Sequence, residues 1–341
     1  MTALGILWFF LIFLLIAGYF VLDGFDLGVG VLYPFLAKTD DEKELVRHSI
    51  GPVWDGNEVW LLTAGGALFA AFAPAYATTF SGFYLAIMLV LFGLILRAVS
   101  VEFASRDPEW ARIWNVCFFV GSLLPALLLG VAVGNVYAGI PMDAAGNYVG
   151  IPLLGLVTPF TLLCGLLGLS MFIVAGASWV ALKAPLDSEL RQRAIKFRFV
   201  GQLAAVVLFV LLSVYGHFLI HPVMDPSLVV ARFACAALFA VMLVASIVVG
   251  RDGEKDLLVF VLQAAAAVAL VFLLATSMFP NLVVASASSI GSSITIATAA
   301  SSDTALGWMT GIACIGVPLV LMYHVLVYRT FRGRLSLGDH S

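Results

Sequence analysis

Long apolar runs recur along the whole chain, separated by short polar links. Nine of these runs can cross a hydrocarbon core of about 30 Å at about 1.5 Å per helical residue. No Lys or Arg precedes the first run, which we interpret as a span and not as a cleavable signal peptide. We therefore predict an all-α polytopic membrane protein with nine transmembrane helices, at residues 4–36, 52–74, 77–104, 115–137, 153–182, 195–220, 229–250, 256–279 and 306–330.

The basic residues predict how this bundle lies in the membrane. All but two of the 17 Lys and Arg residues, Arg97 and Arg232, fall in or beside alternate links, which places them on one side. Because basic residues stay on the cytoplasmic side, we predict that the N-terminus is outside and the C-terminus is cytoplasmic. The residues on the cytoplasmic side are Lys38, Lys43, Arg47, Arg106, Arg112, Lys183, Arg191, Arg193, Lys196, Arg198, Arg251, Lys255, Arg329, Arg332 and Arg334.

The composition supports a membrane protein and argues against other classes. Hydrophobic residues make up 62% of the 341 residues and charged residues 11%, whereas a soluble domain carries about 25% charge. No basic stripe suggests a nucleic-acid partner. The cysteines lie in separate apolar runs and make no C-x-x-C pair, so we predict neither disulfides nor a metal site; they are Cys117, Cys164, Cys235 and Cys314.

Two further segments bear on the architecture. Gly24, Gly28 and Gly30 lack the strand and turn of a dinucleotide-binding fingerprint, and we expect them to allow close helix packing instead. Residues 280–305 form the longest outer connection and are rich in Ser, Ala and Thr. Two interpretations remain open for this outer loop: it lies on the membrane surface or covers a partner, or it is a flexible loop.

Five ionisable residues lie inside the predicted spans, at similar depth toward the cytoplasm: Asp23, Asp26, Asp55, Glu58 and Arg97. Each acid pair is three residues apart and so shares a helix face. A charge at the bilayer centre costs about 2.5–3.5 kcal/mol on insertion scales, so five of them indicate a function. Four acids face one base, and we expect the cluster to share protons near neutral pH.

Simpler interpretations of these residues stay open. Arg97 and one aspartate can form a buried ion pair that locks three helices together. His48, in the first cytoplasmic link, can feed protons to the cluster or can be an ordinary solvated histidine. We therefore compare three functions: proton uptake, ion-coupled transport and an inert scaffold. A transporter should place its site at mid-bilayer within an internal repeat, whereas these acids lie off-centre.

The first three predicted spans resemble subunit II of the cytochrome bd-type quinol oxidases. Residues 22–30 (LDGFDLGVG), 52–61 (PVWDGNEVWL) and 63–71 (TAGGALFAA) carry the resemblance. Ser81-Gly82-Phe83-Tyr84, Arg97 and the late Met278-Phe279-Pro280 extend it. The resemblance covers the whole chain in length and number of spans, and it is most specific over residues 20–105.

The resemblance implies a fold and a set of partners. It implies two four-helix bundles, at 1–137 with the acidic cluster and at 153–279, plus a ninth helix at 306–330. It also implies an inner-membrane complex that oxidises quinol, reduces oxygen to water and builds a proton gradient. The haems, two of type b and one of type d or b, belong to the partner subunit I, so this chain alone is not expected to be catalytic. Small single-span accessory subunits often join the pair, and some members hold a structural quinone in this subunit.

The resemblance also ranks the candidate site residues. It implies a cytoplasmic proton-uptake path through Asp55, with Asp26 nearby, and it places Glu58 and Asp23 on that path with less support. Arg97 matches a residue whose loss disturbs the oxygen-reducing haem region. Trp60 matches an aromatic residue near the subunit interface on a proposed oxygen route. The alternative function that we retain is a proton- or cation-coupled transporter.

Overall fold

The computed structural model describes every residue except 105, 221–224, 252 and 337–341, and its regular elements are almost all helical. The only strands in this described part are β1 (Asn281–Val283) and β2 (Ile294–Thr295), which pair antiparallel. The α-helices are α1 (Ala3–Leu36), α2 (Asp40–Ile50), α3 (Trp54–Ala71), α4 (Ala73–Gly82), α5 (Tyr84–Phe103), α6 (Ala111–Ala138), α7 (Pro159–Lys183), α8 (Glu189–Tyr215), α9 (Val229–Val249), α10 (Asp256–Met278), α11 (Ile296–Ala299) and α12 (Asp303–Thr330).

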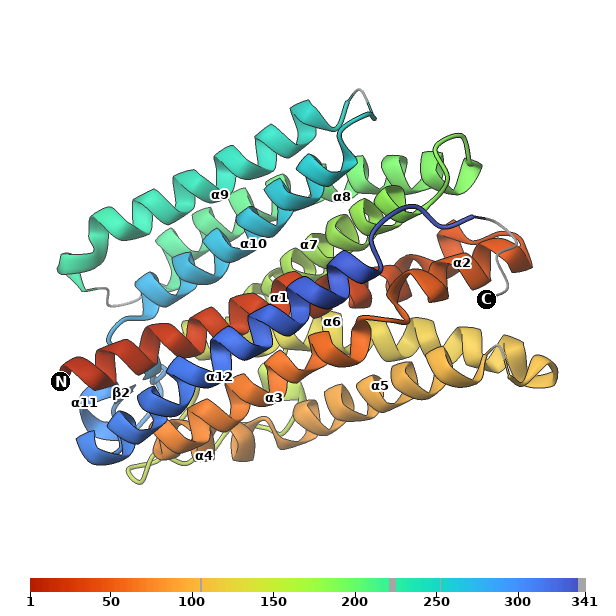
Figure 1. Cartoon of the computed structure of the whole chain (residues 1–341). Coiled ribbons are helices and arrows are strands. Elements are labelled where there is room, and N and C mark those ends of the chain that lie inside the picture. The colour runs from red at the N-terminus through yellow and green to blue at the C-terminus, as the bar shows by residue number, and fades with distance from the viewer. Residues whose placement is uncertain (105, 221–224, 252, 337–341) are drawn as a thin grey trace.

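The long helices lie side by side, so that the bundle has two ends (Figure 1). One end, which we name the positive end, holds α2, residues 331–336 and the described parts of links 104–110, 184–188 and 250–255. The other end, which we name the opposite end, holds the N-terminus, α4 and α11. The basic links therefore gather at one end, as the alternation of basic and non-basic links predicts.

Helix α1 runs through the centre of the molecule. It packs against α3, α6, α7, α10 and α12, and its residues from Asp23 to Tyr33 are buried without interruption. Glycines allow the closest of these approaches, as we predicted from their spacing. A Cβ at Gly28 would lie 1.8 Å from the carbonyl oxygen of Phe172, and a Cβ at Gly176 would lie 2.3 Å from the carbonyl carbon of Gly28. Helices α1 and α7 thus meet backbone to backbone.

Eight of the described helices are long and apolar enough to cross a membrane: α1, α5, α6, α7, α8 with its continuation to Ile220, α9 with the preceding turn, α10 and α12. They match eight of the nine predicted spans. The remaining prediction, 52–74, falls on α3, whose first turns carry Asp55, Asn57 and Glu58 and are therefore too polar to meet the same measure.

Helix boundaries differ from the predicted spans where local signals end a helix. The run 77–104 is divided at Phe83 into α4 and α5. The run 153–182 begins with a short 3₁₀ turn, and α7 starts only at Pro159, after the Thr158 side chain accepts a hydrogen bond from the Thr161 N–H. A hydropathy profile does not detect these helix ends, because the residues on both sides of each one are apolar.

Helix α2 is absent from the sequence prediction because it is polar. Thr39 and Glu42 form a capping box at its start, and Arg47 and His48 stand in its last turn, where cations favour a helix. Arg193 of α8 holds this helix in place through an ion pair with Glu42 and a 2.9 Å hydrogen bond to the Leu36 carbonyl oxygen. The link between α1 and α3, predicted to be cytoplasmic, therefore contains an ordered helix.

The long connection at residues 280–305 is also ordered and covers the opposite end of the bundle (Figure 1). Strand β1 pairs with β2, and the Ile140 N–H donates to the Val284 carbonyl oxygen over 3.0 Å. Helix α11 packs against α1 and α4, and Ile296 in it is fully buried. Residues 280–305 thus pack against this chain's own helices, an arrangement that neither interpretation of this segment described.

Candidate functional site

Arg97 is the centre of a buried ion-pair cluster that joins three helices. Its Nη1 lies 2.7 Å from Asp23 Oδ1 of α1, and its Nη2 donates to Glu58 Oε2 of α3 over 3.1 Å. The contact with Asp23 has the distance of an ion pair but not the direction of a hydrogen bond. Arg97 and Asp23 are fully buried, whereas 22% of the Glu58 side chain is exposed. Glu58 is thus the member of this ion-pair cluster that lies nearest the protein surface.

Asp26 is buried beside this cluster and ends a short hydrogen-bonded chain. The Tyr328 hydroxyl of α12 donates to Asn57 Oδ1 over 2.9 Å, and Asn57 Nδ2 donates to Asp26 Oδ2 over 2.7 Å. The other carboxylate oxygen of Asp26 is buried without a hydrogen-bond partner among the described residues. Neutral partners cannot compensate a charge, so Asp26 depends on Arg97 or on a proton for neutrality.

Several other polar atoms of the cluster are buried without a hydrogen bond within the described part of the chain. They are the Tyr19 hydroxyl, Asp23 Oδ2 and Arg97 Nε. Tyr19 lies one helical turn before Asp23, on the same face of α1. With Asp26 and Glu58, three acids share one arginine, so full ionisation would leave an excess of two negative charges in a medium of low dielectric constant. Proton binding removes that excess, and the geometry therefore favours a set of shared protons.

Two predicted members lie outside this buried group. Asp55, in the first turn of α3, and His48, in the last turn of α2, are both exposed, on the side of the cluster toward the positive end (Figure 1). Neither has an ion pair or hydrogen bond within the described residues. Asp55 stands one turn before Glu58 on α3, toward the surface. The structure thus orders the acids by burial, from exposed Asp55 to partly exposed Glu58 to buried Asp26 and Asp23.

Trp60 occupies a separate position deeper along α3. Its ring fills the space beside Gly18, where a Cβ would lie 2.3 Å from the indole, and its Nε1 donates to His324 Nε2 over 3.3 Å. The second nitrogen of His324 lies 2.9 Å from the Val320 carbonyl oxygen. Trp60 therefore links α3 to α1 and α12 from a buried position.

The described histidines do not fit an axial haem ligand. His324 has both ring nitrogens engaged, and His48 and His217 stand exposed near the two ends of the bundle. Within the described ranges, no group of three or more His, Cys, Asp or Glu side chains is placed to hold a metal ion.

A second buried carboxylate, Asp256, serves as an anchor at the positive end. Three arginines converge on it: Arg191 Nη2 at 2.8 Å, Arg334 Nη2 at 3.1 Å and Arg198 Nη1 at 3.2 Å. Arg334 also donates to the carbonyl oxygens of Ala181 and Ala184, at the end of α7. This group is rich in cations, unlike the acid-rich cluster around Arg97, and it fixes the links between helices.

Sequence reasoning missed Asn57, Tyr328 and Tyr19. Asn57 and Tyr328 are neutral and lie 271 positions apart, so neither shows up in a search for charges. For Asn57, its position in the sequence was the one available signal. Asn57 lies between two acids in a span, and a polar residue there needs a buried partner.

Comparisons with known proteins decide the family. Residues 4–331 match the family described as cytochrome bd terminal oxidase subunit II. The chain belongs to this family. It is therefore a multi-pass membrane protein, in agreement with its eight long apolar helices.

Relatives within this family share close to two fifths of the aligned residues. The chain is 41% identical over 218 residues to the probable cytochrome oxidase subunit 2 of Haemophilus influenzae, covering 62% of this chain and 57% of that protein. It is 41% identical over 219 residues to cytochrome bd-I ubiquinol oxidase subunit 2 of Escherichia coli K12, covering 62% and 56%. It is 38% identical over 226 residues to cytochrome bd ubiquinol oxidase subunit 2 of Bacillus subtilis, covering 63% and 64%. The chain thus aligns with somewhat less than two thirds of each relative.

The fold is also that of a solved bd oxidase. A chain in the structure of bd oxidase from Geobacillus thermodenitrificans superposes with a TM-score of 0.77 at 14% sequence identity, covering 97% of this chain and 99% of that one. At this identity the likeness shows a shared fold and no more.

Proposed function

We propose that this chain is subunit II of a cytochrome bd-type terminal quinol oxidase, which couples quinol oxidation to reduction of oxygen to water. In this proposal a partner subunit I holds haem b and haem d, or haem b in its place. This chain supports that subunit and supplies a proton-uptake path from the cytoplasm. Membership of the subunit II family supports the complex, and the cluster around Arg97 carries the proposal of proton uptake.

The proposed topology counts α3 as the ninth span. Helix α3 packs against α1 and α12 within the bundle, and its polar first turns are at its end nearer the positive end (Figure 1). We assign the positive end to the cytoplasm of a bacterial inner membrane, because basic residues are retained on that side. The N-terminus then lies outside. Helices α1, α3, α5 and α6 form the first proposed bundle, α7 to α10 form the second, and α12 is the additional helix.

The exposed face of α3 supports a partner in the membrane. Leu62 and Val59 are 69% and 44% exposed on the face that also carries Asp55 and Glu58. Apolar side chains can face lipid, but carboxylates there are costly unless protein or water covers them. We infer that subunit I covers this face, so that the acids lie at the subunit interface. Accessory single-span subunits remain an expectation of the family resemblance, and so does a structural quinone.

Proton uptake follows the order of the acids in burial. Asp55 and His48 collect protons at the exposed positive end, and Glu58 receives them one turn deeper on α3. Arg97 holds Glu58 and Asp23 in one group and offsets part of their charge, so that protons exchange between the acids while the cluster stays buried. Asp26 is about 15 Å inside the last residue of α1, and because it is fixed by Asn57, between Asp55 and Glu58 on α3, it lies beside these two acids on the buried side of the path.

The experiment that tests proton uptake is replacement of Asp55 by Asn in the assembled complex. We expect quinol-driven oxygen consumption to fall roughly tenfold or more, because a proton-transfer group is lost, with haem spectra unchanged. Asp187→Asn is the matched control, since Asp187 is also exposed at the positive end and has no ion pair among the described residues. Normal turnover of Asp55→Asn would leave only a scaffold role for this acid.

The transporter alternative receives less support from the structure. A secondary transporter places its ion site near the bilayer midplane, at a repeat interface. Here the acids lie toward the positive end, and the corresponding carboxylate of the second proposed bundle, Asp256, is held by three arginines. Asp256 therefore does not repeat the acid-rich chemistry of the first bundle.

A further inference from the structure

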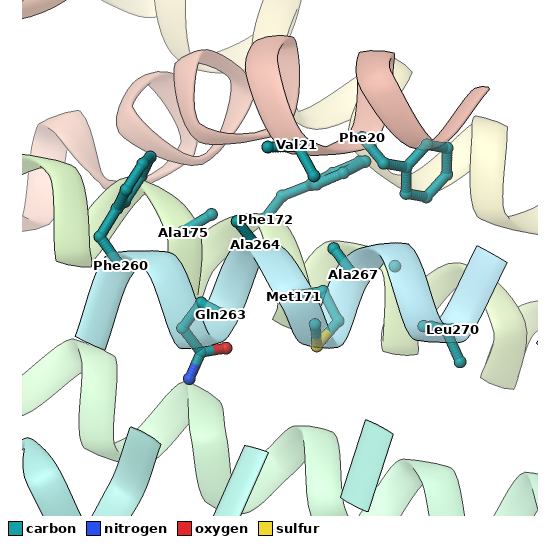
Figure 2. A pocket seen from close by; sticks show the side chains of 11 residues that line it. Phe20, Val21, Met171, Phe172, Ala175, Phe260, Gln263, Ala264, Ala267 and Leu270 are labelled. Carbon is teal, nitrogen blue, oxygen red and sulfur yellow. The ribbon is translucent and has the colours of Figure 1, made fainter. Parts of the chain in front are cut away.

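A large apolar cavity lies away from the acidic cluster, between α1 and α6 to α10 near the opposite end. Its volume is about 610 Å³, within the range of roughly 300–1,000 Å³ for small-molecule sites. Side chains such as Phe160, Phe209 and Leu274 line most of it. A second void, between α1, α7 and α10, is only about 20 Å³ and faces Gln263 and Met171 (Figure 2). That void has room for little more than one water molecule.

One basic side chain, Arg232 of α9, lines the large cavity. It is the single Lys or Arg at the opposite end, since 15 of the others gather at the positive end and Arg97 is buried in the acidic cluster. Its Nη2 makes one long hydrogen bond, of 3.5 Å, to the Asp225 carbonyl oxygen, and its Nε is buried without a partner. No carboxylate of the described residues forms an ion pair with it. Arg232 thus has no counter-charge among the described residues and lies at the edge of an apolar space.

Other hydrogen-bonding groups line the cavity close to the same end of the bundle. His217 follows the end of α8, Tyr137 lies in the last turn of α6, and Ser213 lies in the last turns of α8. A ligand that fits these surroundings has an anionic head for Arg232 and a long apolar tail for the cavity. Among membrane components, an anionic phospholipid combines both. A neutral quinone would fill the apolar space but would leave the guanidinium without a counter-charge.

We propose that this cavity binds an anionic phospholipid, with its phosphate on Arg232 and an acyl chain between α6 and α10. In the topology proposed above, the head lies in the outer leaflet. The lipid fills the interior of the second proposed bundle, where the described side chains leave a gap. The proposal concerns binding and is independent of proton uptake, so its test does not rest on oxidase activity.

The test measures lipid retained by the purified complex. The detergent-stripped complex is exposed to mixed micelles that contain equal amounts of phosphatidylglycerol and phosphatidylcholine with the same acyl chains, and native mass spectrometry counts the bound lipids. We expect one phosphatidylglycerol per complex in preference to phosphatidylcholine. Arg232→Gln should weaken that preference roughly tenfold, which corresponds to one charge-assisted contact, and Arg232→Lys should retain most of it. Arg251→Gln, at the positive end, is the matched control and should behave as wild type.

A second variant tests the apolar part of the site. Ala236 lines the cavity, and Ala236→Phe should lower retention of both lipids while the complex still assembles with its haems. Equal retention of the two lipids by the wild type, or equal loss in Arg232→Gln and Arg251→Gln, would overturn the proposal. Organic extraction that yields one quinone per complex, retained in Arg232→Gln, would also overturn it and assign the cavity to the structural quinone that the resemblance implies.

Discussion

At the scale of single residues, Arg97 holds the first helices together by pairing with two acids at once. Asp23 has no exposed surface and Glu58 has some, so the two pairs are unequal. A buried ion pair contributes little compared with apolar packing, but removal of one partner leaves an uncompensated charge. We therefore expect a single substitution in the cluster to destabilise the complex more than a double substitution that removes both partners of an ion pair.

Arg97→Leu should destabilise the assembled complex by about 3–5 kcal/mol, because Asp23 then lies buried without a cation. The double variant Arg97→Leu with Asp23→Leu should recover a large part of that loss. Thermal unfolding of the complex in detergent measures both. Arg106→Leu is the control, since Arg106 pairs with Glu102 on the surface at 3.6 Å and should change stability by less than about 1 kcal/mol. Additive effects of the Arg97 and Asp23 changes would show that the pair is not coupled.

At the scale of helices, the sequence located the long apolar elements well and the polar ones poorly. Hydropathy found α1, α5 to α10 and α12 because burial in lipid requires continuous apolar residues. It missed α2, whose stability depends on the Thr39–Glu42 capping box and on Arg193, a residue more than 150 positions away from Glu42. Contacts between distant residues leave no periodic pattern in the sequence. The ion pairs of Asp256 with three arginines were not predicted for the same reason.

The contacts of Glu42 make the attachment of α2 dependent on pH. Burial raises the pKa of Glu42, but hydrogen bonds from the Lys38 and Thr39 N–H groups and the Arg193 guanidinium outweigh it, so the pKa lies below its ordinary value of 4.5. The ionised carboxylate therefore stabilises α2 above pH 4.5, and this stabilisation is lost as the pH falls through the lower folded value.

Hydrogen exchange of residues 40–50, corrected for intrinsic rates, should test this attachment. We expect α2 to be protected at pH 7 and to lose protection as the pH falls through the lowered pKa of Glu42. Glu42→Gln should lower the opening free energy at pH 7 by about 1–2 kcal/mol, because the capping box and the ion pair are weakened together. Asp41→Asn, at an exposed position in the same turn, should exchange as the wild type does. Unchanged protection in Glu42→Gln would contradict the role given to this residue.

At the scale of the whole molecule, the charge distribution predicts one orientation in the membrane. Ser288, in the long connection at the opposite end, and Asp187, between α7 and α8, are both exposed and lie at different ends of the bundle. Cysteines at these positions, in a background without the four native cysteines, should therefore differ in access from outside the cell.

An impermeant maleimide added to intact spheroplasts should label Ser288→Cys and should label Asp187→Cys only after the membrane is opened. The reverse pattern would place the positive end outside and would remove cytoplasmic proton uptake through Asp55. The sequence predicted this polarity because charge bias is a property of whole links. It did not predict which acids meet, since that depends on the rotation of α1, α3 and α5 about their axes.

The contact of Gly28 with α7 has a consequence for the evolutionary record of this family. At a pair such as Gly18 and Trp60, a larger residue at one position can be accommodated by a smaller side chain at the other. Substitutions at the two positions should therefore covary between relatives. Gly28 and Gly176 cannot, because each meets the other helix's backbone, which no substitution makes smaller. Both positions should therefore stay fixed, and a fixed position carries no covariation. The junction of α1 and α7 would then be invisible to methods that infer contacts from correlated change, although the backbones approach each other there.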